Sequence, residues 1–110
     1  MRNDKAYIKH IYDTIIDLEG FTKDATLTDF LKDTEKQYAV IRAFEVIGEA
    51  SKNISAEFKK KHPGVPWTKM SAMRDNLIHG YFGVNLELVW STVKVNIPEI
   101  KNRIKALKAR

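Results

Sequence analysis

Cysteine is absent from this chain of 110 residues, and histidine and proline occur only three times each. Without cysteine, neither a disulfide nor a thiolate metal site can form, which fits a reducing cytoplasm. No apolar run approaches the length of a membrane span, and the charged N-terminus lacks the apolar segment of a signal peptide. We therefore expect one cytoplasmic domain over residues 1–110 with no membrane contact, small enough that oligomerisation would bury further apolar surface.

Positive charge exceeds negative charge, with a formal net charge of +5, and the excess is concentrated near the C-terminus. From Lys94 to Arg110 there are six basic residues and one acid, Glu99. This stretch is either a solvated basic helix face or an electrostatic footprint for nucleic acid. His10 and His62 have no partner at ligand spacing, so we expect no metal site.

Apolar residues recur at helical spacing along almost the whole chain, which predicts an all-α bundle. The first helix is expected to be capped by Asn3 or Asp4 and to stop at Gly20. A short helix within Thr26 to Asp33 should contribute Phe30 and Leu31. The inward residues of the first helix are at spacings of three and four: Ile8, Ile11, Ile15 and Leu18.

A longer helix is expected from Thr34 or Glu35 to about Lys60, with apolar residues Tyr38, Ile41, Phe44, Ile47, Ile54 and Phe58. Two prolines and a glycine in residues 62–66 would end it. The next helix should run from about Trp67 to His79, with Trp67, Met70, Met73 and Leu77 inward and Gly80 at its C-terminus.

The last apolar stripe continues through a proline, Pro98, without losing phase. Its residues are Leu86, Trp90, Val93, Ile97, Ile100, Ile104 and Leu107. The helix is therefore expected either to kink at Pro98 or to stop there and restart in register.

One octapeptide combines the side chains most suited to catalysis: Arg74-Asp75-Asn76-Leu77-Ile78-His79-Gly80-Tyr81. Histidine exchanges protons near neutral pH, and arginine offers a charged planar fork for phosphate oxygens. Asp75 lies four residues before His79 and could hold its imidazole in one tautomer. The alternative is that His79 merely caps the helix and interacts with its dipole.

Helical geometry separates Arg74 from His79 by roughly 140° around an ideal helix axis. The two converge on one phosphate only if the helix ends near His79 or if a second subunit supplies its own copy. The single histidine of the octapeptide cannot easily act as both acid and base, which also favours a dimeric site.

A second polar stripe lies at helical spacing among apolar residues: Arg42, Glu45, Glu49 and Lys52. It is either an exposed ladder of intrahelical ion pairs, or one or both glutamates point into the bundle and support a basic site. Gly48 and Ala50 would let another helix approach closely there.

The octapeptide matches the R-x-x-x-x-H-x-Y signature and resembles the HepT-like toxins, a branch of the HEPN superfamily. Further similarity lies in Arg42-Ala-Phe-Glu-Val-Ile-Gly-Glu-Ala50, Val65-Pro66-Trp67, Val89-Trp90 and Ile97-Pro98-Glu99. The resemblance covers nearly the whole chain. It implies a four- to five-helix up-down bundle that forms a homodimer, with two copies of the motif lining a cleft.

The resemblance also implies the activity, a metal-independent endoribonuclease that serves as the toxin of a type II toxin–antitoxin system. Arg74 and His79 would be catalytic, and Asp75 and Asn76 would support them, with Arg42, Glu45 and Glu49 as possible outer supports. The reaction uses the ribose 2′-hydroxyl, so RNA would be cut and DNA would not.

The implied partner is a nucleotidyltransferase antitoxin of the MNT type, which would transfer AMP from ATP to Tyr81. The bulky anionic adduct would block the cleft, while the toxin itself would need no cofactor. Two alternatives stay open: a non-catalytic partner or substrate-binding subunit of a nucleotidyltransferase, and a helical protein that grips ATP phosphates. Neutralisation by simple occlusion also stays open.

Overall fold

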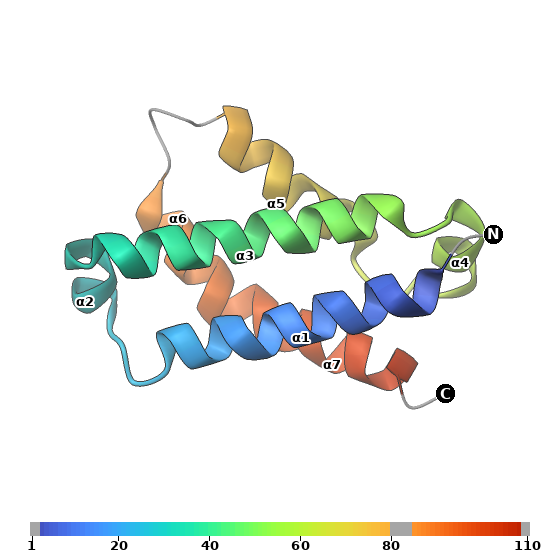
Figure 1. The fold of residues 1–110 in the computed structure, drawn as a ribbon, viewed down its shortest axis with the longest axis horizontal. Helices are drawn as coiled ribbons and strands as arrows, with labels where there is room; N and C mark the ends of the chain where they lie inside the picture. Colours follow the sequence, from blue (N-terminus) through green and yellow to red (C-terminus); the bar gives the residue numbers. More distant parts are fainter. Residues whose placement is uncertain (1–2, 80–84, 109–110) are drawn as a thin grey trace.

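Helices make up the regular structure of this protein (Figure 1). The computed structural model describes residues 3–79 and 85–108, with the backbone alone at 76–79, and these residues contain no strand. The predicted all-α fold class is confirmed. In chain order the elements are α1 (Asp4–Thr22), α2 (Leu27–Lys32), α3 (Thr34–Asn53), α4 (Ala56–Lys61), α5 (Trp67–His79), α6 (Leu86–Ser91), the π-helical turn η1 (Thr92–Asn96) and α7 (Ile97–Lys108).

Helix α3 packs against both α1 and α5, and α7 packs against α1. Figure 1 shows α1 and α3 side by side and running in opposite directions, with α2 at the turn between them. Of the helices in residues 3–79 and 85–108, none combines the length and apolar character that a bilayer crossing requires.

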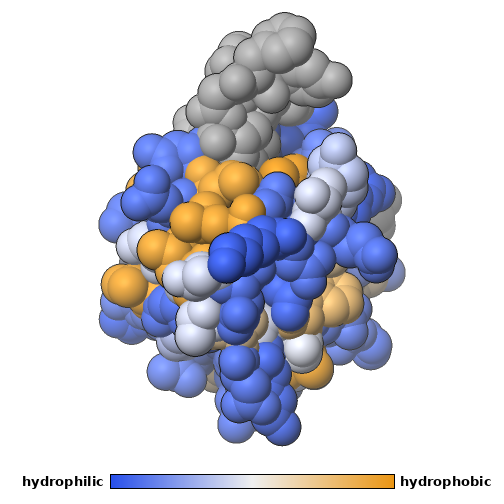
Figure 2. Space-filling view, turned by 90° about the vertical axis from the view of Figure 1, so that its left-hand side faces the viewer, coloured by the Kyte–Doolittle hydropathy of each residue, from blue (hydrophilic) through white to orange (hydrophobic). Residues whose placement is uncertain are grey.

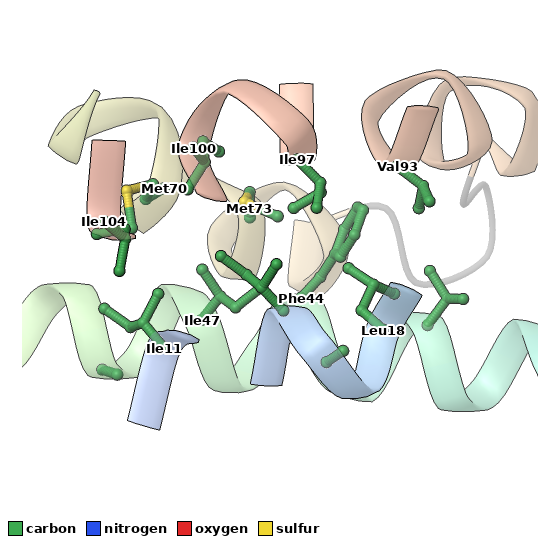
Figure 3. Close-up of a cluster of buried hydrophobic side chains, with 14 of the residues drawn as sticks. Ile11, Leu18, Phe44, Ile47, Met70, Met73, Val93, Ile97, Ile100 and Ile104 are labelled. Carbon is green, nitrogen blue, oxygen red and sulfur yellow. The ribbon is translucent and has the colours of Figure 1, made fainter. Parts of the chain in front are cut away.

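The core lies between α1, α3, α5 and the C-terminal helices, and Figure 3 shows side chains from all of them meeting there. The predicted inward residues of α1 are buried, as are Trp67, Met70 and Met73 of α5. Of the two residues that the short helix was expected to contribute, Phe30 is buried, whereas Leu31 is 42% exposed and does not join the core. Tyr38, one of the apolar residues of α3, is 70% exposed.

Helix α1 was predicted to stop at Gly20, but it continues to Thr22. Asn3 caps its N-terminus by accepting a hydrogen bond from the Ala6 amide, as expected. A helical glycine costs only about 1 kcal/mol relative to alanine. Thr22 is buried and its hydroxyl donates to the Leu18 carbonyl at 3.0 Å, and both features favour the continuation of the helix past Gly20.

The predicted long helix to Lys60 is interrupted, because α3 ends at Asn53 and α4 begins at Ala56. Ser55 caps α4 by accepting from the Phe58 amide at 3.1 Å. The Ser55 amide and hydroxyl donate to the Asp4 carboxylate at 2.9 and 2.8 Å. These bonds give the amide and hydroxyl of Ser55 partners while its backbone is outside helical geometry. They therefore explain why the helix breaks here.

At Pro98 the helix does not stop, because η1 runs directly into α7 and Pro98 lies within α7. The wider π turn η1 immediately precedes Ile97, whose backbone keeps right-handed helical angles (φ −60°, ψ −43°). Proline lacks an amide donor and crowds the carbonyl four residues earlier, and a π turn relieves both problems. The apolar stripe therefore stays continuous, with Trp90, Val93 and Ile97 all buried.

Large apolar side chains are also exposed at the surface, among them Leu27 on α2, Leu88 on α6 and Val95 on η1. Figure 2 looks onto the end of the molecule that carries α2, and hydrophobic residues gather on one part of this face. Exposed apolar patches of this kind often mark interaction surfaces.

Candidate active site

The octapeptide begins on α5, whose bounds of Trp67 and His79 agree with the prediction. Trp67 anchors the start of this helix by donating its indole N–H to the His62 carbonyl at 2.9 Å. With Met70 and Met73 buried on one face, Arg74 and Asp75 are only partly buried. The side chains of Asn76 and His79, and Gly80 and Tyr81 entirely, lie outside the described residues, so their roles stay predictions.

Helix α5 lies very close to α3 at Gly48. A Cβ atom added to Gly48 would lie 2.5 Å from the Cβ of Arg74 and 2.8 Å from its backbone nitrogen. Real Cβ contacts do not reach such distances, so the crossing requires glycine here. The predicted close approach is confirmed, and it fixes the backbone from which Arg74 projects.

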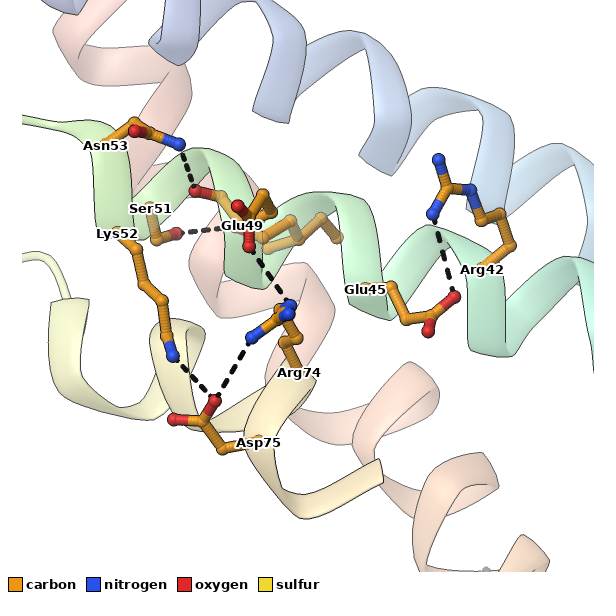
Figure 4. Close-up of polar contacts among 9 residues, drawn as sticks. Arg42, Glu45, Glu49, Ser51, Lys52, Asn53, Arg74 and Asp75 are labelled. Carbon is orange, nitrogen blue, oxygen red and sulfur yellow. Dashed lines mark hydrogen bonds and ion pairs between the residues drawn. The ribbon is translucent and has the colours of Figure 1, made fainter. Parts of the chain in front are cut away.

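Ion pairs then hold the Arg74 side chain (Figure 4). Its Nε atom lies 3.0 Å from Glu49 Oε2, and one terminal nitrogen lies 3.6 Å from Asp75 Oδ1. The same Asp75 oxygen accepts a hydrogen bond from Lys52 Nζ at 2.6 Å. Charges of alternating sign therefore run from α3 to α5 and orient the guanidinium group.

The polar stripe on α3 divides between the two alternatives. Arg42 and Glu45 form an exposed intrahelical pair at 3.7 Å, as a surface ladder would. Glu49 and Lys52 instead reach across to α5. Glu49 supports Arg74, but its side chain is 57% exposed, so it does not point into the bundle.

Lys52 was not predicted as a site residue, although its spacing of three from Glu49 places it on the same face. The predicted role of Asp75 was to orient His79. The structure brings Asp75 to Lys52 and Arg74, which makes it a link between two cations as well.

A groove with a volume of about 440 Å³ opens beside Arg74, between α1, α3 and α5. Its lining comes from all three helices and includes both polar and apolar groups: Tyr7, His10, Arg42, Glu45, Val46, Glu49, Ala50, Asn53 and Arg74. Tyr7 and His10 were missed as site residues, because their proximity to Arg74 depends on the packing of α1 against α3.

Several basic side chains of the C-terminal stretch are engaged in contacts with other side chains of the same chain. Lys101 Nζ bonds to Glu19 at 2.9 Å, and Lys94 and Lys108 lie over the rings of Trp90 and Tyr12 at 4.7 and 4.2 Å. In residues 3–79 and 85–108, excluding the side chains of 76–79, no three histidine or carboxylate groups are clustered as metal ligands would be.

The structure thus defines an all-helical bundle in which an arginine is held between two carboxylates beside a surface groove. Residues 11–107 match the family described as Ribonuclease HepT-like. The chain belongs to this HepT-like ribonuclease family, and the resemblance noted in the sequence is confirmed.

Similar proteins cover nearly the full chain. A Thermococcus cleftensis protein named "Probable ribonuclease HepT" is 49% identical over 107 residues, which are 97% of each chain. A Caldanaerobacter subterraneus protein named "Putative RNase" is 40% identical over 97% of this chain and 96% of its own. A Methanocaldococcus jannaschii protein, also named "Putative RNase", is 47% identical over 86% of this chain and 78% of its own. No solved structure gives a significant match.

Proposed function

We propose that this protein is a metal-independent endoribonuclease and the toxin of a type II toxin–antitoxin system. One observation carries the proposal: Arg74 is fixed by Glu49 and Asp75 on the helix that ends at His79. An arginine with its Nε and one terminal nitrogen already paired still presents further N–H donors to a phosphate. The names of the relatives support RNA as the substrate.

The reaction is an attack of the ribose 2′-oxygen on the adjacent phosphorus. The 2′-hydroxyl loses its proton to one imidazole, the P–O5′ bond breaks, and a second imidazolium protonates the leaving 5′-oxygen. The products are a 2′,3′-cyclic phosphate and a 5′-hydroxyl. Arg74 stabilises the charge on the phosphorane, His79 moves the protons, and Asp75 and Asn76 support them.

The site is completed by a second copy of the chain. Both Arg74 and His79 lie on α5, and positions five residues apart are roughly 140° apart around an ideal helix axis. A homodimer supplies two histidines, one as base and one as acid. The exposed apolar side chains of α2 and α6 offer surface of the kind that such association buries.

The antitoxin is a nucleotidyltransferase of the MNT type that transfers AMP to the Tyr81 hydroxyl. The adduct adds bulk and negative charge two residues from His79, which repels RNA phosphates. This predicts that AMP modification lowers RNA affinity more strongly at low salt than at high salt.

Expression of the chain alone in a bacterial host tests the activity. We expect growth arrest and RNA with cyclic phosphate ends, persisting in chelator, and loss of both effects in Arg74→Ala and His79→Ala. A harmless wild-type chain that leaves RNA intact would instead favour a non-catalytic partner of a nucleotidyltransferase.

Mass spectrometry of the Tyr81 peptide after incubation with the antitoxin and ATP tests the switch. Full neutralisation with unmodified tyrosine would indicate occlusion.

A further inference from the structure

The groove beside Arg74 is built from the exposed faces of three helices. Tyr7 and His10 are three residues apart on α1 and therefore share a face. Arg42, Glu45 and Glu49 line the opposite side from α3. The volume of about 440 Å³ falls in the range of sites for small organic groups.

The chemistry of this lining suits an unpaired nucleobase. Single-stranded RNA is recognised by stacking of bases on aromatic rings or guanidinium planes, and by hydrogen bonds to base edges. Tyr7 and His10 supply rings, Arg42 supplies a guanidinium plane, and Glu45 supplies carboxylate acceptors. These groups come together beside Arg74, the residue assigned to the phosphate.

The ion pairs leave the lining of this groove without a large excess of positive charge. Arg42 is paired with Glu45 at 3.7 Å and Arg74 with Glu49 at 3.0 Å, so cations and carboxylates offset one another. A base carries no formal charge and therefore does not need an excess of cations around it. A second groove, between the α4–α5 connection and α7, is lined by two cations and one carboxylate, Lys61, Arg103 and Glu99.

We propose that the groove between α1 and α3 binds an unpaired base of the RNA, next to the phosphate held at Arg74. The inference rests on the proposed ribonuclease function and adds a specificity site to it. Carboxylates accept hydrogen bonds from the amino groups of guanine, adenine and cytosine, which uracil lacks. Uracil offers a carboxylate only its ring N3–H, so we expect it to be the disfavoured base in the groove.

Fluorescence anisotropy with short 2′-fluoro RNA measures this binding without cleavage, because the attacking hydroxyl is absent. We expect Tyr7→Ala and His10→Ala each to weaken affinity on the order of tenfold, the effect of losing one stacked base. Tyr7→Phe should retain affinity. The matched controls Tyr38→Ala and His62→Ala lie outside this groove and should leave affinity unchanged. Glu45→Gln should reduce the discrimination against uracil-only RNA.

Circular dichroism identifies the variants that fold. If Tyr7→Ala does not fold, Tyr7→Phe and the variant at the exposed His10 position still test the proposal. Unchanged affinity in folded His10→Ala and an unchanged base preference in Glu45→Gln would overturn the proposal. So would a change of oligomeric state without a loss of RNA affinity, because a second copy would then cover the groove. Failure of the ribonuclease proposal is seen separately, as binding that depends on the groove while unmodified RNA stays intact.

Discussion

Helix α3 meets its neighbours in two different ways. Toward the core it presents apolar side chains such as Phe44 and Ile47, which belong to the same buried cluster as Ile11 and Leu18 of α1 (Figure 3). Toward α5 it presents a glycine and charged groups, with Gly48 against Arg74 and Glu49 bonded to its guanidinium. The same helix thus serves as a scaffold on one side and positions the candidate active site on the other.

The two sides differ in what they contribute energetically. Full burial of an isoleucine stabilises a fold by about 1.5–3 kcal/mol, whereas a partly exposed ion pair contributes about 0–1 kcal/mol. The pairs around Arg74 are 36–57% exposed, so their main effect is on geometry. Substitutions on the two sides should therefore separate stability from activity.

The largest stability effect is expected from Ile11→Ala on the scaffold side. Ile11 is fully buried, and truncation leaves a cavity, so the free energy of unfolding should fall by about 2–5 kcal/mol. Chemical denaturation measures this loss. Ile16→Ala, at a position 41% exposed on the same helix, is the control and should lose far less. Equal losses would contradict the assigned core.

Gly48→Ala should affect both stability and activity. The added methyl group meets Arg74 at 2.5 Å, so the helices must separate, at a cost of about 1–3 kcal/mol. RNA cleavage should also fall, because Arg74 moves with α5. Gly20→Ala is the matched control, since open space surrounds it, and it should stabilise the helix by about 0.5–1 kcal/mol.

Glu49→Gln should separate the two properties most clearly. Removal of the carboxylate charge should lower the free energy of unfolding by less than about 1 kcal/mol. The rate of RNA cleavage should fall on the order of 10- to 100-fold, because a displaced guanidinium no longer matches the transition state. The control is Glu19→Gln, which removes a comparable interhelical pair to Lys101 at 2.9 Å and should retain full activity.

The smallest effect is expected from Lys101→Met, which breaks the same α7–α1 pair from the other end. The hydrogen bond to Glu19 raises the pKa of Lys101 above its usual 10.5. The stabilising contribution of the Lys101–Glu19 pair is therefore fully present at pH values below the usual pKa of lysine. It is lost as the pH rises through the raised pKa of Lys101. Denaturation at neutral pH should show a small deficit that disappears at strongly alkaline pH, with unchanged RNA cleavage at neutral pH. A deficit independent of pH would indicate lost packing instead.

Much of this architecture was predictable from residue spacing. The α1 stripe and the bounds of α5 follow from apolar periodicity, because a helix places every third or fourth residue on one face. The predictions failed where distant residues compete with local preference. Asp4, far away in sequence, stabilises the break at Ser55, and the burial of Thr22 extends α1 past Gly20.

The site shows the same division. Arg74 and Asp75 stood out because of their side-chain chemistry and their place in the octapeptide, and Glu49 because of its spacing. The link from Lys52 to Asp75 joins residues 23 positions apart and has no local signal. Tyr7 and His10 are farther still from Arg74 in the sequence and enter the site only through helix packing.

The sequence by itself determined the helical class, the apolar stripes and the residues with catalytic chemistry, since these depend on composition and short-range spacing. Tertiary structure alone decided which charges meet. The crossing of α3 and α5 at Gly48 brings Arg74 to Glu49, and the packing of α1 against α3 opens the groove beside them. The physical reason is that ion pairs and grooves depend on distances between helices, which no single helix encodes.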